Sequence, residues 1–455
     1  MIVTSYLPVD LYALVPEALQ CQDPVVAALD PLIDEELVQL VRADFGQRYP
    51  QSVTRGRPST PVEVIVRMLV VRRLYDWSYA DTAHWVADSI SLRQFCRVGT
   101  HPVPDASTLD RWAACLQPDT LRRLNDRLVM HAQQHGVTRG RKLRLDTTVV
   151  ETTIHYPSDS TLLADGVRVL SRLVSRTRSL VAGPASLFRS RVRSAVRRAR
   201  AIGESTRRGG TAGQLLRQRQ YRALVGIARA MVRQVRQIIT CLPHGAPLRA
   251  RLVTMADRTE QVIEQTTRRL AGEAVPAGDK LVSLFESHTA IIRRDKPRAR
   301  VEYGHKVLLA ETDGGILTQA RVLAGNAADA GELDESLLVH AQQFGRPPHL
   351  VATDRGFWHP SCEERARAAG VTVVAIPQSG GRVSPARRAR EREPWFRRAQ
   401  RFRAGGEGRI SVCKRRGHLG RCRDHGAEGF ARWVGWGIIA NNLRSIASAD
   451  LTRVT

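Results

Sequence analysis

The sequence contains little acid for its length. Its 455 residues include 70 Lys and Arg but 44 Asp and Glu, which gives a formal net charge of +26. Such an excess favours a polyanionic partner and says nothing about the fold. A chain this long also exceeds one ordinary hydrophobic core, so we expect two or three domains.

Long apolar runs are missing as well. No stretch of about 18 apolar residues occurs, and Arg67 interrupts the apolar segment 62–71. The first residues lack the basic segment and the apolar core of a secretory signal. We therefore expect a soluble, cytoplasmic protein without a membrane partner.

Cysteine and motif patterns exclude several further classes. The seven cysteines are an odd number scattered along the chain, which favours reduced thiols over a disulfide framework. Neither a P-loop nor a Gly-rich dinucleotide fingerprint occurs. One group of potential zinc ligands lacks the CxxC pair typical of structural zinc sites, so zinc is not predicted there: Cys413, His418, Cys422 and His425.

The first third of the chain has helical patterns. Pro61 suits the first position of a helix, and Ser107 with Asp110 resembles a capping box. Short helices of this kind are compatible with a helix-turn-helix and equally with any small bundle. We predict that residues 1–137 form an N-terminal helical domain of the DNA-binding type, helix-turn-helix-like.

The middle of the chain is rich in arginine. Between residues 166 and 256 the one acid is Glu204. We predict a helical insertion over residues 157–295, apolar inside and Arg-rich outside. A charge run is usually a solvated surface, but a single sign over so many residues favours phosphate contacts. Apolar residues recur at helical spacing within 211–240: Leu216, Leu224, Ile227, Met231, Val235 and Ile238.

Beyond residue 298 the apolar period changes to two. Two predicted strands meet at a turn over residues 313–315, and a helix follows over 329–345. Next come a strand that ends at Asp354, a helix and another strand. Residues 379–406 show many arginines and no clear period, so we predict a basic loop there, followed by an apolar C-terminal helix.

One more predicted strand precedes the insertion and ends at Asp146. Without the insertion, the strands and helices form an α/β unit from residues 138–156 and 296–455. Its sheet would be mixed and flanked by helices, because it combines a hairpin with strand-helix-strand crossovers.

Two strands in this scheme end in a carboxylate. If they are parallel neighbours, Asp146 and Asp354 meet at the carboxyl edge of the sheet, where open α/β sheets place their sites. Adjacent carboxylates repel one another, and divalent cations such as Mg²⁺ or Mn²⁺ remove that cost. Two such ions about 4 Å apart can activate water and stabilise the leaving oxygen of a phosphodiester.

Glu407 is the candidate for a third carboxylate. Arg403 lies four residues before it and Lys414 seven residues after it, so a helix places all three on one face. The surrounding glycines weaken such a helix, and Arg403 can instead belong to the preceding loop. Three other acids compete for the role: Glu151, Glu391 and Glu428.

Taken together, these blocks resemble a bacterial insertion-sequence transposase of the DDE type, with an RNase H-like catalytic core. The similar segments include "PDASTLDRW", "LRLDTTVV", "VLAGNAADAGEL", "ATDRGFW" and "EGRISVCKRRGHL". The signature Y-x2-R-x3-E-x6-K of one large transposase group is matched at Arg403, Glu407 and Lys414. Gln400 stands at the Tyr position, which is a departure.

The resemblance implies an enzyme that binds the terminal inverted repeats of its own element, cuts DNA at the element ends and joins the freed 3′-OH to target DNA. Asp146, Asp354 and Glu407 would bind two Mg²⁺ ions, for which Mn²⁺ can substitute, and Arg403 and Lys414 would contact phosphates. The partners would be double-stranded DNA and a second copy of the chain, as a homodimer on DNA at the bacterial nucleoid.

Three alternatives to this function stay open at the level of the sequence. One is a catalytically silent DNA-binding protein derived from a transposase. Another is an RNase H-like nuclease without strand transfer, which would yield no joined product. The third is an RNA-binding structural protein, which would share the charge but have no use for the strand-end acids.

Overall fold

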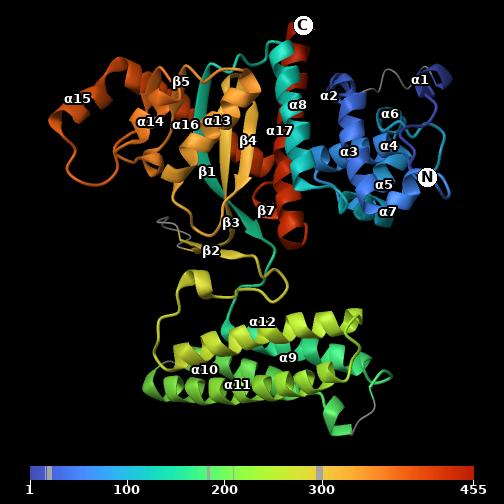
Figure 1. Cartoon of the computed structure of the whole chain (residues 1–455), viewed down its shortest axis with the longest axis vertical. Coiled ribbons are helices and arrows are strands. Elements are labelled where there is room, and N and C mark those ends of the chain that lie inside the picture. Colours follow the sequence, from blue (N-terminus) through green and yellow to red (C-terminus); the bar gives the residue numbers. More distant parts are fainter. Residues whose placement is uncertain (16, 18–22, 182–184, 209, 294–300, 455) are drawn as a thin grey trace. The chain divides into compact units, whose positions relative to one another are not determined.

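The computed structural model describes residues 1–15, 17, 23–181, 185–208, 210–293 and 301–454 (Figure 1). The chain divides into two units: unit 1 contains Met1–Glu151 and His305–Thr455, and unit 2 contains Thr152–Gly304. The predicted end of the insertion, at residue 295, lies outside the described residues. The four-part domain division therefore stays a prediction.

The N-terminal part of unit 1 is helical. Asp105 caps α7 by accepting a hydrogen bond from the Thr108 N–H at 2.7 Å. The predicted capping box of Ser107 and Asp110 is wrong, because α7 begins one residue before Ser107. The helices are α1 (Leu11–Leu14), α2 (Pro24–Leu29), α3 (Glu35–Arg48), α4 (Val62–Tyr75), α5 (Tyr79–Asp88), α6 (Ile90–Phe95), α7 (Ala106–Ala113) and α8 (Pro118–Gln134).

A mixed sheet lies in unit 1, as the sequence predicts. Its order is β4-β3-β1-β5-β6, with β7 beside β1, and β2 pairs with the first residues of β3. The β3–β4 hairpin is antiparallel, whereas β1, β5 and β6 are parallel. The strands are β1 (Lys142–Thr152), β2 (Ala290–Arg293), β3 (Val301–Thr312), β4 (Leu317–Val322), β5 (Leu350–Ala352), β6 (Val373–Ala375) and β7 (Arg421–Cys422).

The condition on which the shared carboxylate edge depends is met, because β1 and β5 are parallel neighbours. Arg144 pairs with Ala352 at the last position of the register, two residues before each strand-end aspartate. The prediction that Asp146 ends its strand is wrong, because β1 continues to Thr152. Residues 147–150 are Thr-Thr-Val-Val, whose β-branched side chains favour extended backbone, and β7 pairs with this continuation.

Helices cover the sheet and extend to the C-terminus. The last of them, α17, packs beside α8 and contributes Trp436, Ile439 and Leu443 to the core of the N-terminal helices (Figure 1). They are α13 (Leu333–Phe344), α14 (Cys362–Ala368), α15 (Pro385–Arg392), α16 (Pro394–Arg415) and α17 (Gly426–Val454).

The basic loop predicted for residues 379–406 is wrong over most of its length, because this segment contains α15 and the first half of α16. The buried residues of α16 are few and mostly small or sulfur-containing, so no apolar period stands out in the sequence: Phe396, Ala399, Gly406 and Cys413. A Cβ at Gly405 would lie 2.6 Å from Arg144 Nη1. Glycine therefore permits α16 to pack closely against β1.

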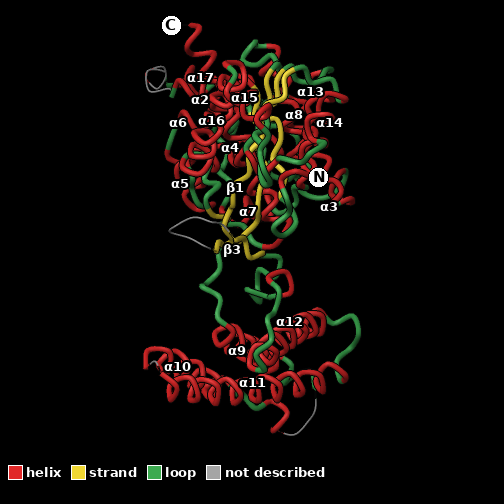
Figure 2. The backbone as a smooth tube through the Cα atoms, turned by 90° about the vertical axis from the view of Figure 1, so that its left-hand side faces the viewer, coloured by secondary structure: helices red, strands yellow, loops and turns green. Residues whose placement is uncertain are grey.

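Unit 2 contains the helices of the predicted insertion. Figure 2 shows this unit largely as helices joined by loops. Leu170, Leu224, Met231 and Val235 lie in its shared hydrophobic core. The helices are α9 (Asp159–Arg176), α10 (Val192–Arg208), α11 (Gly210–Thr240) and α12 (Pro247–Leu270).

The described residues bear on two features, membrane-spanning helices and disulfides. None of their helices combines the length and the apolar character that a bilayer crossing requires. Six cysteines are described, and none of them forms a disulfide.

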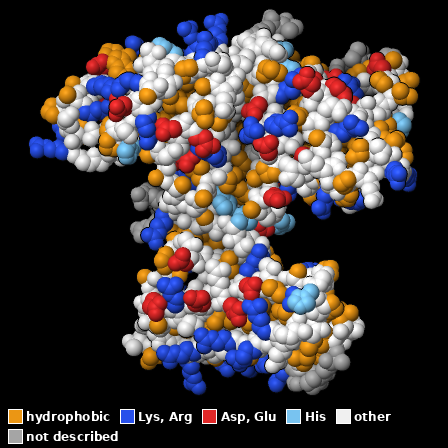
Figure 3. All heavy atoms as spheres, viewed as in Figure 1, with side chains coloured by type: hydrophobic (Ala, Val, Ile, Leu, Met, Phe, Trp, Pro, Cys, Tyr) orange, Lys and Arg blue, Asp and Glu red, His pale blue; other side chains and the backbone are white. Residues whose placement is uncertain are grey.

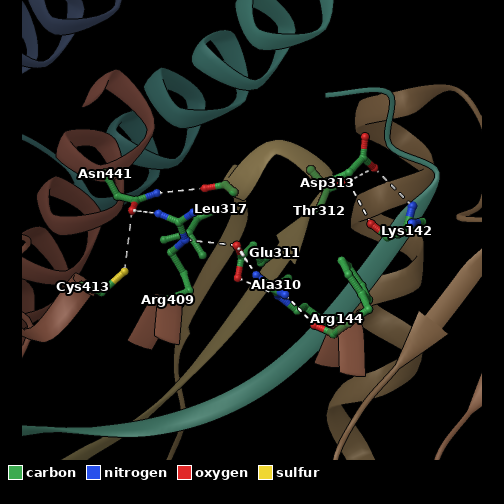
Figure 4. Close-up of polar contacts among 12 residues, drawn as sticks. Lys142, Arg144, Ala310, Glu311, Thr312, Asp313, Leu317, Arg409, Cys413 and Asn441 are labelled. Atoms are coloured by element: carbon green, nitrogen blue, oxygen red, sulfur yellow. Dashed lines mark hydrogen bonds and ion pairs between the residues drawn. The ribbon is translucent and has the colours of Figure 1, made fainter. Parts of the chain in front are cut away.

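A buried ion-pair network holds α16 on the sheet (Figure 4). The side chain of Glu311, on β3, is 4% exposed and accepts two hydrogen bonds from Arg144, at 2.6 and 2.8 Å. Arg409, on α16, donates to the same carboxylate at 3.1 Å and to Asn441 Oδ1 at 3.2 Å. One carboxylate thus joins β1, β3 and α16, and Asn441 extends the network to α17.

We predict that Glu311→Gln lowers the free energy of unfolding by about 3–5 kcal/mol, because it leaves two partly buried guanidinium groups without a counter-charge. Chemical denaturation measures the change. The matched control is Glu151→Gln, whose pair with Arg421 is solvent-exposed and contributes about 0–1 kcal/mol. Equal effects of the two substitutions would contradict the assigned role of Glu311.

Candidate active site

Asp146 lies on β1 just past the part that pairs with β5. Its Oδ1 accepts a hydrogen bond from the Thr147 N–H at 2.8 Å, and its Oδ2 lies 3.3 Å from Arg403 Nη2. The side chain is 15% exposed. The carboxylate is therefore oriented from both sides while one edge stays open to solvent.

Asp354 follows β5 and caps the 3₁₀ turn Arg355–Phe357. Its Oδ1 accepts from the Gly356 N–H at 2.9 Å, and its Oδ2 lies 3.8 Å from Arg403 Nη2. Asp146 and Asp354 therefore share one guanidinium nitrogen. Their approach follows from the parallel register of β1 and β5, which brings both aspartates to the same edge of the sheet.

Glu407 comes to this edge on α16. Its Oε1 accepts from Arg403 Nη1 at 2.9 Å, one helical turn away, and its side chain is mostly exposed. The single guanidinium of Arg403 thus lies within ion-pair distance of all three predicted carboxylates. Arg403 belongs to α16 itself, so the alternative that it lies in a preceding loop is wrong.

Gln400 explains how α16 reaches the sheet edge. Its Nε2 donates to the backbone oxygen of Ala375 at 2.8 Å and of Thr353 at 3.3 Å, which are the ends of β6 and β5. Gln400, which stands at the signature Tyr position, therefore links α16 to the ends of these two strands by hydrogen bonds. Lys414 is partly buried two turns beyond Glu407 on the same helix.

The three carboxylates do not form a closed ligand cage. Within the described ranges, no three Asp, Glu, His or Cys side chains approach closely enough to hold one ion together. The same holds for the four potential zinc ligands named above: Cys413, His418, Cys422 and His425. The donors at the sheet edge are nevertheless hard carboxylate oxygens around one positive charge, which is the chemistry that suits Mg²⁺ or Mn²⁺.

A further carboxylate beside the site escaped the sequence interpretation. Asp329 Oδ2 accepts a hydrogen bond from Thr147 Oγ1 at 3.4 Å, and its Oδ1 lies 2.7 Å from Lys306 Nζ. A Cβ at Gly356 would lie 2.8 Å from Asp329 Oδ2, so the turn after Asp354 passes directly over it. In the sequence, Asp329 resembles an acid at the start of a helix. That pattern does not indicate that its side chain lies beside the site.

The rival acids are engaged elsewhere, each with an arginine partner. Glu151 pairs with Arg421, and Glu428 pairs with Arg432. Glu391 accepts from Arg387 at 2.8 Å. Glu407 is thus the acid that the structure brings to Asp146 and Asp354, and the catalytic and metal-binding roles of the three stay predictions.

The electrostatics of the site are most evident at Asp146. Burial raises the pKa of this carboxyl to about 6, and repulsion from Asp354 and Glu407 adds to the rise. Arg403 and the Thr147 N–H oppose it. Without a further cation, one guanidinium does not offset the cost of burying this charge.

Comparison with known proteins gives a match in the N-terminal part of the chain. A family model described as a transposase domain (DUF772) matches residues 14–114. The match supports a transposase-related protein. No curated protein and no solved structure is significantly similar to the chain. The matched segment covers helices of unit 1 before the sheet, so the three carboxylates lie outside it.

We predict that Asp146→Asn stabilises the metal-free protein at pH 8 by about 1–3 kcal/mol. Above pH 6 the wild-type carboxylate is ionised in the folded state at a cost, and the amide removes that cost. As the pH falls from about 6 to below 3.8, the folded wild type takes up the proton first, so the advantage of the variant disappears.

Denaturation with chelator at pH 8 and pH 4 measures this difference. The control is Asp88→Asn, an exposed residue at the end of α5, with an expected change within about 0.5 kcal/mol at both pH values. A destabilised Asp146→Asn protein at pH 8 would contradict the argument.

Proposed function

We propose that the chain is a metal-dependent DNA transposase of the DDE type, with an RNase H-like core. It binds the terminal inverted repeats of its own element as a homodimer, cuts the DNA at the element ends and joins the freed 3′-OH to target DNA. The supporting observation is the approach of one guanidinium to carboxylates from three separate segments: β1, the end of β5 and α16.

Three further features support this proposal. The transposase-domain match accounts for the N-terminal helices and makes DNA the expected polyanion. The excess positive charge suits a phosphate backbone. The mixed sheet, with a hairpin on one side of β1 and two parallel strands on the other, is compatible with the proposed core.

Asp146, Asp354 and Glu407 would hold two Mg²⁺ ions. When bound, such ions lower the pKa of a water molecule and stabilise the charge on the leaving oxygen of a phosphodiester. The residues of the chain do the positioning. The N–H groups of Thr147 and Gly356 orient the two aspartates, and Asp329, paired with Lys306, accepts a hydrogen bond from the Thr147 hydroxyl.

Arg403 and Lys414 contact the phosphates near the cleaved bond in this proposal. A guanidinium suits that role because its planar donors match phosphate oxygens, while Lys414 adds a second charge along the same helix. The reaction needs no covalent enzyme intermediate, since the freed 3′-OH itself attacks the target phosphodiester in line.

We predict that the wild-type protein with Mg²⁺ cuts and joins duplexes that carry the DNA flanking its coding sequence. Asp146→Ala, Asp354→Ala and Glu407→Ala each reduce cutting about 100-fold or more, because each removes a ligand of the metal site. Gel analysis of cut and joined products measures both steps. Glu428→Gln is the control and keeps full activity. Cutting without any joined product would identify a nuclease instead.

Arg403 gives a prediction that does not depend on turnover. Its charge competes with a divalent cation for the same carboxylates, so Arg403→Gln binds Mg²⁺ about 5–10-fold more tightly while DNA cutting falls. Titration calorimetry with Mg²⁺ alone measures the affinity. The control is Arg401→Gln, an exposed arginine on the same helix, which leaves the affinity unchanged. Weaker Mg²⁺ binding by Arg403→Gln would exclude a shared site.

A further inference from the structure

Charge is segregated among the helices of unit 2. The exposed face of α12 carries three acids, Asp257, Glu260 and Glu264, and two of them pair with Arg236. The exposed face of α11 carries no acid along its whole length. Figure 3 shows Lys and Arg side chains gathered along the edge of this unit where Figure 1 draws α11, and acids nearer α12.

Four exposed arginines form a single row on α11, which we call the α11 stripe: Arg219, Arg222, Arg229 and Arg233. They are spaced by three, seven and four residues, so they share one helix face, and Gly226 fills the gap on that face. At 1.5 Å per residue the stripe is about 21 Å long. In the part of the chain that the structure describes, no carboxylate lies within ion-pair distance of any of the four.

The opposite face of α11 fixes the direction of the stripe. Leu224, Met231, Val235 and Ile238 are fully buried in the core of unit 2. A helix that is anchored along its apolar side cannot rotate to cover its charges. The buried face therefore fixes the row along the exposed side of the helix, where Arg229 also donates a hydrogen bond to Thr267 Oγ1 at 3.1 Å.

The stability of unit 2 does not explain why these arginines form a row. Like charges three or four residues apart on a helix destabilise it by about 0.2–0.5 kcal/mol per pair, and alternating acids, as on α12, would remove that cost. A second row on α10 is spaced by four, three and seven residues, also on one helix face, and is interrupted by one acid, Glu204: Arg193, Arg197, Arg200 and Arg207. An open depression of about 590 Å³ lies against this helix and is lined in part by Arg193, Arg197 and Arg200. Both rows suit a partner that carries regularly spaced negative charge.

We propose that the α11 stripe binds the phosphate backbone of double-stranded DNA without reading its sequence. Guanidinium groups spaced along a straight helix suit phosphates repeated along a duplex. A lipid surface fits poorly, because a helix that lies on a membrane inserts its apolar face, and here that face forms the core of unit 2. The inference rests on the proposed function for the identity of the polyanion.

The test is the salt dependence of binding by the full-length protein to a duplex of arbitrary sequence. Fluorescence anisotropy between about 50 and 300 mM KCl gives the slope of log K against log salt. Replacing all four arginines of the α11 stripe by Gln makes the slope less negative by about 3–4 and weakens binding at least tenfold at low salt. An unchanged slope would overturn the proposal.

A control variant removes the same charge from ion-paired positions. Its slope changes by less than about 1, because these side chains already have carboxylate partners. A loss equal to that of the stripe variant would mean that net charge, and not the stripe, drives binding, and would overturn the proposal. The replaced residues are Arg168, Arg236, Arg268 and Arg269, each changed to Gln.

Two further readouts separate the possible failures. Thermal melting of the stripe variant is expected at or above the wild-type midpoint, since repulsion is removed, so lost binding is not unfolding. If the stripe variant loses affinity for single-stranded RNA but not for duplex DNA, the proposal is wrong. If wild type fails to cut element-end DNA while the slope still changes, the proposed function fails and the DNA-binding stripe stands.

Discussion

Repulsion among the carboxylates of Asp146, Asp354 and Glu407 is balanced in this structure by the guanidinium of Arg403. The three acids come from segments that lie far apart in the sequence, and each is supplied by a different element. The balance is incomplete, since burial still raises the pKa of Asp146 to about 6. Because ionised Asp146 is still unfavourable in this site, a divalent cation or a further cationic side chain would stabilise it.

That arrangement depends on how closely α16 approaches β1. Gly405 leaves room for the Arg144 side chain, whose guanidinium reaches Glu311, and Arg409 approaches the same carboxylate from α16. Gln400 fastens the same helix to the ends of β5 and β6. These contacts are structural, yet they decide where Arg403 and Glu407 lie. Gly405, which weakens a helix in isolation, here leaves room for the guanidinium of Arg144.

The sequence predicts part of this geometry and misses the rest for identifiable reasons. The sequence suggests the adjacency of β1 and β5 only as a condition: two apolar runs that lead into aspartates place both acids at one edge if the strands are parallel neighbours. The extent of β1 is not predictable, since residues beyond Asp146 gain their strand partner from β7, far along the chain. The helix α16 is missed because its buried side is small and its glycines resemble a loop, although the spacing of Arg403 and Glu407 indicates one shared face. Asp329 is missed because a helix-start acid and a site-facing acid have the same local pattern.

Burial and pairing separate the roles of arginine in this chain better than composition does. Arg144 and Arg409 have a buried carboxylate partner and hold the fold together, whereas the arginines of the α11 stripe have none and remain exposed. The net charge of +26 favours a polyanionic partner but does not show which cations are free to contact it. Under the proposed function, the enzyme would have to stay on its DNA between chemical steps, and contacts that ignore sequence would serve that need. The role proposed for the α11 stripe uses no group from the carboxylate site, so substitutions would alter the proposed binding and the proposed chemistry separately.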